Sequence, residues 1–268
     1  TDGMIYKLTG EWTPSDDVMF YATYSEGFRA GLLNRPGGAS GPGGYTVPYA
    51  VDTDEVKNYE LGWKTELFDN SLRFNGSAFF VDIEGLQTTI FDPSIVNLFF
   101  SDNAANAEIQ GLEGDFTWAP ASVDGLTIAG AFSLLDTEIT EVLVPTDDVV
   151  EGSDLAFAPA YQGNLRVRYE WDLEQEVAGQ RLTAHVMPQI VFSDDSVSDV
   201  IEINKMDLDG YVTLGGSMGV TGDNWGAEIF ASNLTNEYAE LSGSFVYDRE
   251  RITPMRPRTI GIRVSYDY

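Results

Sequence analysis

Apolar and polar residues alternate with a period of two along most of the chain. In the last ten residues, five apolar side chains share one face: Ile260, Ile262, Val264, Tyr266 and Tyr268. The positions between them are polar or small: Thr259, Gly261, Arg263, Ser265 and Asp267. Successive side chains of a β-strand point to opposite sides of the sheet, so this spacing predicts strands with one apolar and one polar face.

The same alternation predicts eleven strands and an all-β fold. We expect the strands near residues 3–13, 17–27, 55–68, 71–91, 104–118, 125–139, 160–172, 180–193, 209–221, 224–235 and 256–268. No apolar run reaches the 18 residues of a membrane-spanning helix, and residue 1 does not open a signal-like segment. If this chain meets a membrane, it does so with strands.

Short and long connections alternate between these strands. The short ones carry Asp, Asn, Gly or Pro and lie at 14–16, 69–70, 119–124, 172–179 and 222–223. The long ones lie at 27–54, 92–103, 140–159, 193–208 and 237–255. Tight turns on one rim and long loops on the other are typical of outer-membrane β-barrels, with the turns in the periplasm and the loops outside the cell.

Large aromatic residues gather near the short turns, which distinguishes this pattern from that of a soluble β-sandwich. Trp63 alone among the tryptophans lies farther along its strand. We predict a membrane-interface rim made by Trp12, Phe68, Trp118, Trp171, Trp225 and Tyr268. A sandwich core would place its large aromatics in the middle of the strands. The sequence therefore favours a transmembrane antiparallel β-barrel in contact with outer-membrane lipid.

The amino-acid composition restricts the classes of partner and site that this chain can have. The 15 Lys and Arg against 43 Asp and Glu give a net charge of −28, which argues against nucleic acid because phosphate binding needs a basic surface. Cysteine is absent, which excludes disulfides, thiolate metal sites and thiol catalysis. The 12% of aromatic residues argues against a disordered acidic chain. We expect the acidic residues on solvated loops and on a polar lumen.

Eleven strands cannot close into an antiparallel barrel by themselves. The first and last strands of such a meander run in the same direction, whereas bacterial single-chain barrels have an even number of strands. We therefore expect residues 1–268 to form the C-terminal part of a barrel, and twice eleven gives 22, the strand number of plugged outer-membrane transporters.

Several short motifs resemble those of TonB-dependent receptors, in matching order. The most specific is residues 21–31, YATYSEGFRAG, at a strand-to-loop transition. Further matches run along the chain: residues 59–64 (YELGWK), 106–113 (NAEIQGLE), 233–238 (NLTNEY) and the terminal strand 257–268. The resemblance implies a 22-strand barrel in the bacterial outer membrane that takes up a scarce ligand, such as a ferric siderophore.

The same resemblance implies partners that these residues do not contain. They are an N-terminal plug, the remaining strands of the barrel and a TonB-type energy-transducing protein. A companion lipoprotein or envelope complex is left open as a further partner. A passive porin is the alternative function, followed by a soluble adhesin-like β-protein. The presence of a plug would separate the first two, and dependence on detergent would separate both from the third.

The candidate site residues are few, and no catalytic residue is predicted. Arg29, Arg35, Tyr45 and Tyr49 in the glycine-rich loop could contact a small-molecule ligand, or could simply decorate that loop. His185 is the single histidine and is expected to make a structural hydrogen bond in the lumen, because one histidine cannot form a zinc site. A divalent cation could bind two acidic runs, whose members are Asp52, Asp54 and Glu55, and Asp147, Asp148, Glu151 and Asp154.

Overall fold

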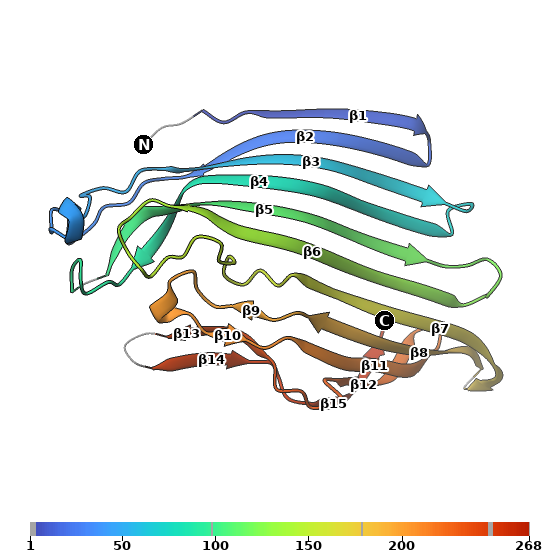
Figure 1. Cartoon of the computed structure of the whole chain (residues 1–268). Coiled ribbons are helices and arrows are strands. Elements are labelled where there is room, and N and C mark those ends of the chain that lie inside the picture. Colours follow the sequence, from blue (N-terminus) through green and yellow to red (C-terminus); the bar gives the residue numbers. More distant parts are fainter. Residues whose placement is uncertain (1–3, 98, 178, 246–248, 268) are drawn as a thin grey trace.

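The computed structural model describes residues 4–97, 99–177, 179–245 and 249–267 and is all-β (Figure 1). Eleven strands form one sheet: β1 (Lys7–Ser15), β2 (Val18–Arg29), β3 (Asp54–Leu67), β4 (Leu72–Ile90), β5 (Phe100–Trp118), β6 (Leu126–Val142), β7 (Tyr161–Val177), β8 (Gln180–Ser193), β11 (Tyr211–Thr221), β12 (Trp225–Ser232) and β15 (Thr259–Tyr266). Among the described residues, no helix has the length and apolar character needed to cross a bilayer. The eleven predicted strands are confirmed.

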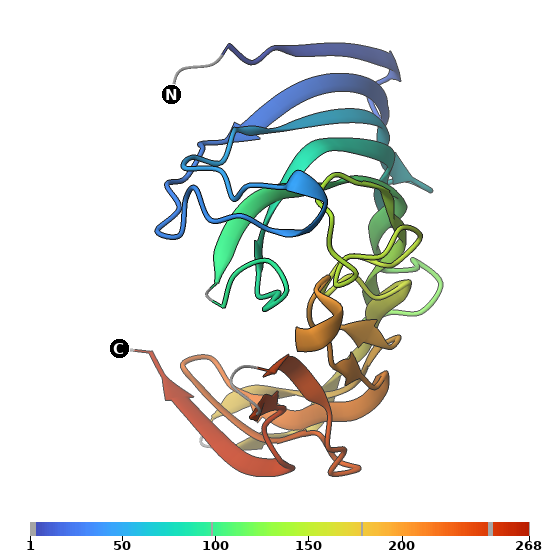
Figure 2. The same ribbon diagram turned by 60° about the vertical axis from the view of Figure 1, so that its left-hand side comes forward.

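The sheet is an antiparallel meander in which each strand pairs with the next along the chain. Figure 2 shows the strands bending in an arc from β1 to β15, with the two ends of the chain on the open side. Within the described part of the chain, β1 pairs only with β2 and β15 only with β12. The structure is therefore an open portion of a barrel wall and not a closed eleven-strand barrel.

Cross-strand register assigns each side chain to one of two faces. Ile262 lies opposite Ile229, which lies opposite Met218, and all three side chains are more than half exposed. On the other face, Arg263 lies opposite Glu228 and forms an ion pair with it. We call these the apolar face and the polar face. Their separation confirms the alternation predicted for the terminal strand.

Small residues let aromatic rings lie flat on the sheet. The ring of Trp63 covers Gly76, its partner on β4, and a Cβ at Gly76 would come 2.9 Å from Trp63 Cε2. An aromatic ring that covers a cross-strand glycine replaces the packing that glycine lacks.

The tight turns and long loops alternate as predicted, but several strand boundaries differ from the predicted ones. The segment 172–179 was predicted to be a turn, but β7 continues to Val177, and only residues 178 and 179 separate it from β8. A register shift after Asp172 is followed by the pair Glu176 and Arg181. Opposite charges on facing strands favour this extension. In the same way, β5 begins at Phe100, inside the predicted loop 92–103, because Phe100 is buried among other loop residues.

The long loops contain secondary structure that the sequence did not predict. The loop after β8 holds β9 (Ser196–Val197), the 3-10 turn η2 (Glu202–Asn204) and β10 (Asp207–Leu208). The loop after β12 holds the hairpin of β13 (Glu240–Phe245) and β14 (Glu250–Pro254), and the loop after β2 holds the 3-10 turn η1 (Pro42–Gly44). These elements are short and lack a long alternating pattern.

The hydrophobic core lies at the long-loop end of the sheet and not between two layers of strands. Its members come from the loop after β2, from the loop ends of β4, β5 and β6, and from the loops after β4, β6 and β8. They are Val47, Ile90, Ile95, Phe100, Ala104, Ala105, Ile139, Val144, Val149 and Ile201. We call this assembly of loops the cap.

Candidate functional site

The loop between β2 and β3, residues 30–53, folds back on itself. Its two arms pair near the base, where Val51 N donates to Leu32 O at 2.7 Å and Asn34 N donates to Tyr49 O at 2.9 Å. Nearer the tip, Gly38 N donates to Val47 O at 2.8 Å. Gly43 and Gly44 at the turn have positive φ angles, a conformation that glycine adopts without strain. The glycines of this loop thus build a defined turn.

The underside of loop 30–53 packs into the cap. Val47 is fully buried, and the ring of Tyr45 lies 6.3 Å from that of Phe100. The Tyr45 hydroxyl donates a hydrogen bond to the Asp102 carboxylate. Burial of the ring, together with this hydrogen bond and the negative charge of Asp102, raises the pKa of Tyr45 well above its ordinary value. Tyr45 therefore stays protonated and serves as a donor inside the cap.

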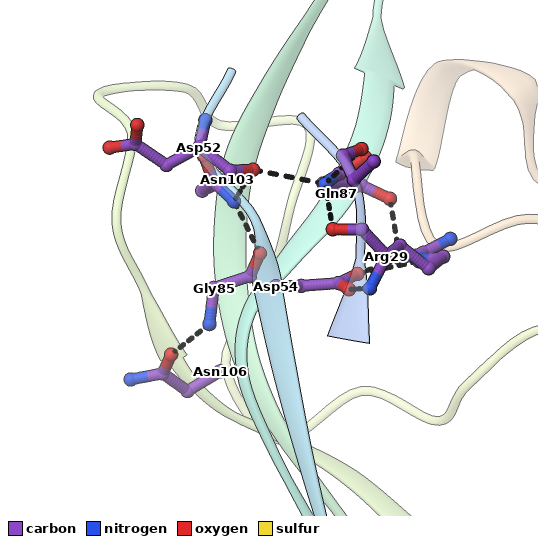
Figure 3. Close-up of polar contacts among 8 residues, drawn as sticks. Arg29, Asp52, Asp54, Gly85, Gln87, Asn103 and Asn106 are labelled. Atoms are coloured by element: carbon purple, nitrogen blue, oxygen red, sulfur yellow. Dashed lines mark hydrogen bonds and ion pairs between the residues drawn. The ribbon is translucent and has the colours of Figure 1, made fainter. Parts of the chain in front are cut away.

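The base of loop 30–53 is fixed by an ion pair at the last rung between β2 and β3. Arg29 and Asp54 are cross-strand partners, and Arg29 Nε donates to Asp54 Oδ2 at 2.6 Å. The backbone N of Arg29 donates to the other carboxylate oxygen at 2.8 Å. Asp54 is 1% exposed, so its charge is offset inside the protein by these donors (Figure 3).

Side chains from β4 and β5 complete this base. Gln87 Nε2 donates to the carbonyl oxygens of Ala30 at 3.2 Å and Asp52 at 2.9 Å. Asn103 Nδ2 donates to Asp52 O at 3.1 Å, and Asn103 Oδ1 accepts from Asp52 N at 2.9 Å. Figure 3 shows Gln87 and Asn103 turned toward Arg29 and Asp52. Polar side chains of two strands thus bind the backbone of a third segment.

The four predicted ligand residues fall into two pairs. Arg29 and Tyr45 already have partners within the protein. Arg35 and Tyr49 lie on the exposed surface of the loop, where the Tyr49 side chain is 73% exposed. Ligand contact by all four stays a prediction. The sequence did not point to Gln87 or Asn103, because one glutamine and one asparagine among many polar residues give no periodic or motif signal.

The acidic loops come together in the cap. Glu202 N donates to Asp148 O at 2.8 Å, which joins the loop after β8 to the loop after β6. Burial, and then the charges of Asp92, Asp147 and Glu202, raise the pKa of Asp148. Among the residues that the structure describes, no three His, Asp or Glu side chains are placed to hold a metal ion. Asp54, from the other acidic run, is bound to Arg29.

His185 lies on the polar face, as predicted, and is 6% exposed, but its buried Nε2 atom makes no hydrogen bond among the described residues, so the expected structural hydrogen bond is not found at this atom. Its Nε2 atom is 3.4 Å from Glu228 Oε2, although β11 runs between their two strands. Gly219 of β11 pairs with both residues and has no side chain to separate them. Glu228 also binds Arg263, whose guanidinium lies 5.3 Å from the centre of the Phe230 ring. A row of polar side chains, His185, Glu228 and Arg263, therefore crosses the polar face near the end of the chain.

The predicted rim residues lie toward the short-turn end of the strands, although the extension of β7 to Val177 places Trp171 inside that strand and not at its end. Trp12 stacks on Phe20, and Trp171 on Tyr169, each pair with ring centroids 5.7 Å apart. Phe68 is 72% exposed in the turn after β3, Trp118 ends β5, and Trp225 begins β12 opposite Tyr266. Tyr268 lies outside the described residues. Contact of this rim with lipid headgroups stays a prediction.

Comparison with known proteins gives the following similarities. A family model described as "TonB dependent receptor-like, beta-barrel" matches residues 2–236. The metal-pseudopaline receptor CntO of Pseudomonas aeruginosa is 26% identical over 96% of this chain, which covers 33% of that protein. The chain therefore spans about a third of the length of this relative.

Solved structures show the same fold. The ferric yersiniabactin uptake receptor FyuA from Yersinia pestis matches 98% of this chain with a TM-score of 0.73 and 17% identity, over 37% of its own chain. The siderophore receptor PiuA from Acinetobacter baumannii also gives a TM-score of 0.73, with 18% identity, over 98% of this chain and 36% of its own.

Proposed function

Because this chain belongs to the TonB-dependent receptor β-barrel family, we propose that the full-length protein is an outer-membrane transporter that takes up a scarce nutrient by energy-dependent, ligand-gated transport. The nutrient is a metal complex of a small organic chelator, such as a ferric siderophore. The proposal is supported by the family and by the similar proteins, which are receptors for metal-pseudopaline, for ferric yersiniabactin and for a siderophore. TonB-type energy transduction and a plug supplied by the rest of the protein complete the mechanism.

In this proposal, loop 30–53 makes the first contact with the ligand outside the cell. The observation that carries this role is the folded loop itself, whose underside is anchored in the cap while Arg35 and Tyr49 remain on its surface. Arginine provides a charge for carboxylate or hydroxamate oxygens, and tyrosine provides a rigid amphipathic surface. The strands supply the wall of the transport path.

Uptake by whole cells tests the transport proposal. The full-length protein would be expressed in cells that lack other metal-chelate receptors, which are then given radioactive iron, nickel or zinc bound to carboxylate or catecholate chelators. We expect saturable uptake of at least one chelate, abolished when the TonB-type energy transducer is deleted. Uptake that survives this deletion would instead indicate a passive porin.

Point variants test the role of the loop. Because Val47 and Tyr45 belong to the cap, deleting residues 35–49 would damage the cap core as well as the surface. We therefore expect the double variant Arg35→Ala with Tyr49→Ala to weaken ligand binding about tenfold or more while leaving surface-exposed barrel unchanged. Tyr238→Ala is the matched control, because Tyr238 is 66% exposed in a different loop. Equal binding by both variants would contradict ligand contact by loop 30–53.

A further inference from the structure

Gln87 holds both ends of loop 30–53 with one side-chain amide. Its Nε2 lies 3.4 Å from Arg29 O and 3.2 Å from Ala30 O at the start of the loop, and 2.9 Å from Asp52 O at its end. In return, the Arg29 guanidinium donates to Gln87 O at 3.3 Å. A single carboxamide thus takes the place of the backbone rungs that β2 and β3 lose where they separate.

Asn103, on the neighbouring strand β5, forms further hydrogen bonds to the end of the loop. Gln87 and Asn103 are cross-strand partners on β4 and β5, so their side chains point the same way. Asn103 binds both the N and the O of Asp52, as a paired backbone residue would do in a sheet. Together, the two amides hold Asp52 through three hydrogen bonds.

A β-bulge in β4 lies next to these amides. The register between β4 and β5 shifts before Leu86 and returns after it, at Gln87 and Asn103, and Gly85 has a φ of +66°. The backbone N of Gly85 donates to Asn106 Oδ1 at 2.8 Å, and its O accepts from Asn103 Nδ2 at 2.7 Å (Figure 3). A bulge redirects the side chains beside it, and here its own polar groups are satisfied by side chains of β5.

We propose that Gln87 and Asn103 are positioning residues for ligand capture, which set the base of loop 30–53 so that Arg35 and Tyr49 are presented in a preformed arrangement. This inference rests on the proposed function. A loop ordered before the ligand arrives does not pay the entropy of ordering during binding, so a fixed base raises affinity without touching the ligand. We call the two amides and the backbone groups they bind the clasp.

Two isosteric variants would open the clasp without removing volume. Gln87→Glu and Asn103→Asp each replace an NH2 donor by an oxygen that repels the carbonyl groups it faces. Gln110→Glu is the matched control, because Gln110 is also a strand glutamine but its amide donates to Asp136 and not to the loop. All variants would be made in the full-length protein and checked for surface-exposed barrel.

The first measurement is the mobility of the loop. Leu33 is 86% exposed, and these 268 residues contain no cysteine, so Leu33→Cys provides a site for a nitroxide label. We expect both clasp variants, but not Gln110→Glu, to sharpen the label's spectrum. Amide exchange at Asn34 and Val51, whose N–H groups close the two arms, should become faster as well.

The second measurement is uptake of the radioactive chelate that supports transport by the parent protein. We expect the half-saturating concentration to rise about five- to tenfold in the clasp variants, with the maximal rate unchanged. Unaltered label mobility would overturn the clasp, and greater mobility with unaltered half-saturation would overturn its role in ligand capture. A parent protein that takes up none of the chelates would contradict the proposed function itself, which the mobility measurement separates from failure of the clasp.

Discussion

The eleven-stranded sheet, which we call the wall, exposes large apolar residues that the cap buries. On the apolar face of the wall, Ile262 is 73% exposed and Met218 is 60% exposed. In the cap, Ile139 and Val47 are fully buried. Both environments occur within β6, where Leu134 is 45% exposed and Ile139, five residues later, is fully buried.

This difference is the one expected of a chain whose sheet faces lipid and whose loops face water. In lipid, apolar side chains face outward because the bilayer is itself apolar, and the backbone must satisfy its hydrogen bonds within the wall. In water, the loops must bury apolar side chains among themselves, as the cap does. We therefore expect each strand that enters the cap to change its pattern of apolar and polar residues where it leaves the lipid, and the following substitutions test that expectation.

The largest effect is expected in the cap, from Phe100→Ala. Phe100 is 2% exposed, so its removal should leave a cavity that costs about 3–5 kcal/mol of local stability. Amide exchange at Val47 and Ile95 should accelerate, while that of the strands should not. Phe157→Ala is the control, because Phe157 is a half-exposed loop residue. A global loss of the barrel would show that the cap and the wall are a single cooperative unit.

A somewhat smaller effect is expected when the same change is made in both regions. Ile262→Arg places a charge on the apolar face and should cost about 2–4 kcal/mol near the middle of the bilayer. Ile203→Arg in the cap, where Ile203 is 44% exposed to water, should change stability by no more than about 0.5 kcal/mol. Reversible folding into lipid vesicles measures both. Equal costs would contradict the assignment of the apolar face to lipid.

The smallest effect concerns charge within the cap. The pKa of Asp148 is raised by burial and then by neighbouring carboxylates, so the ionised form that prevails at neutral pH is disfavoured in the folded cap. The stability linked to this group is complete below its ordinary pKa and is lost as pH rises through the folded value. Asp148→Asn should therefore stabilise the cap slightly at pH 7, and the gain should vanish near pH 3. Amide exchange at Glu202 would measure it.

The pKa of Asp92 is shifted in the opposite direction from that of Asp148, so Asp92→Asn serves as the control. Burial alone would raise its pKa, but hydrogen bonds from Ser94, Thr146 and the Ile95 backbone outweigh burial and lower it. Its contribution is present above its ordinary pKa and is lost as pH falls through the folded value. Asp92→Asn should therefore destabilise the cap at pH 7. Effects of the same sign for both variants would contradict this electrostatic arrangement.

The wall could be predicted from the sequence because its physics is local and periodic. A strand with one face in lipid needs an apolar residue at every second position, as from Ile260 to Tyr266. The number and the order of the strands could therefore be predicted from this alternation. The extension of β7 was missed because its pairing depends on a charge pair, Glu176 with Arg181, that no periodic pattern reveals.

The cap could not be predicted in the same way. Its core joins residues as far apart as Val47 and Ile201, and such contacts leave no pattern in any one segment. Residue type alone identified Arg29 and Tyr45 as candidates. It did not predict that Asp54 binds Arg29 or that Asp102 binds Tyr45. Gln87 was missed because its role lies in hydrogen bonds to the backbone of Ala30 and Asp52, and such long-range contacts of one polar residue leave no motif or periodic signal.

Because Gly219 has only a hydrogen atom as its side chain, side chains of the two strands on either side of β11 can approach each other across it. Strands β8 and β12 stand about 9–10 Å apart with β11 between them, yet His185 and Glu228 approach within 3.4 Å. In most sheets, a change on one strand is felt first by its immediate neighbours. Here Glu228 lies beside His185 of β8 and also binds Arg263 of β15, so one carboxylate adjoins side chains of two strands that backbone pairing does not join directly.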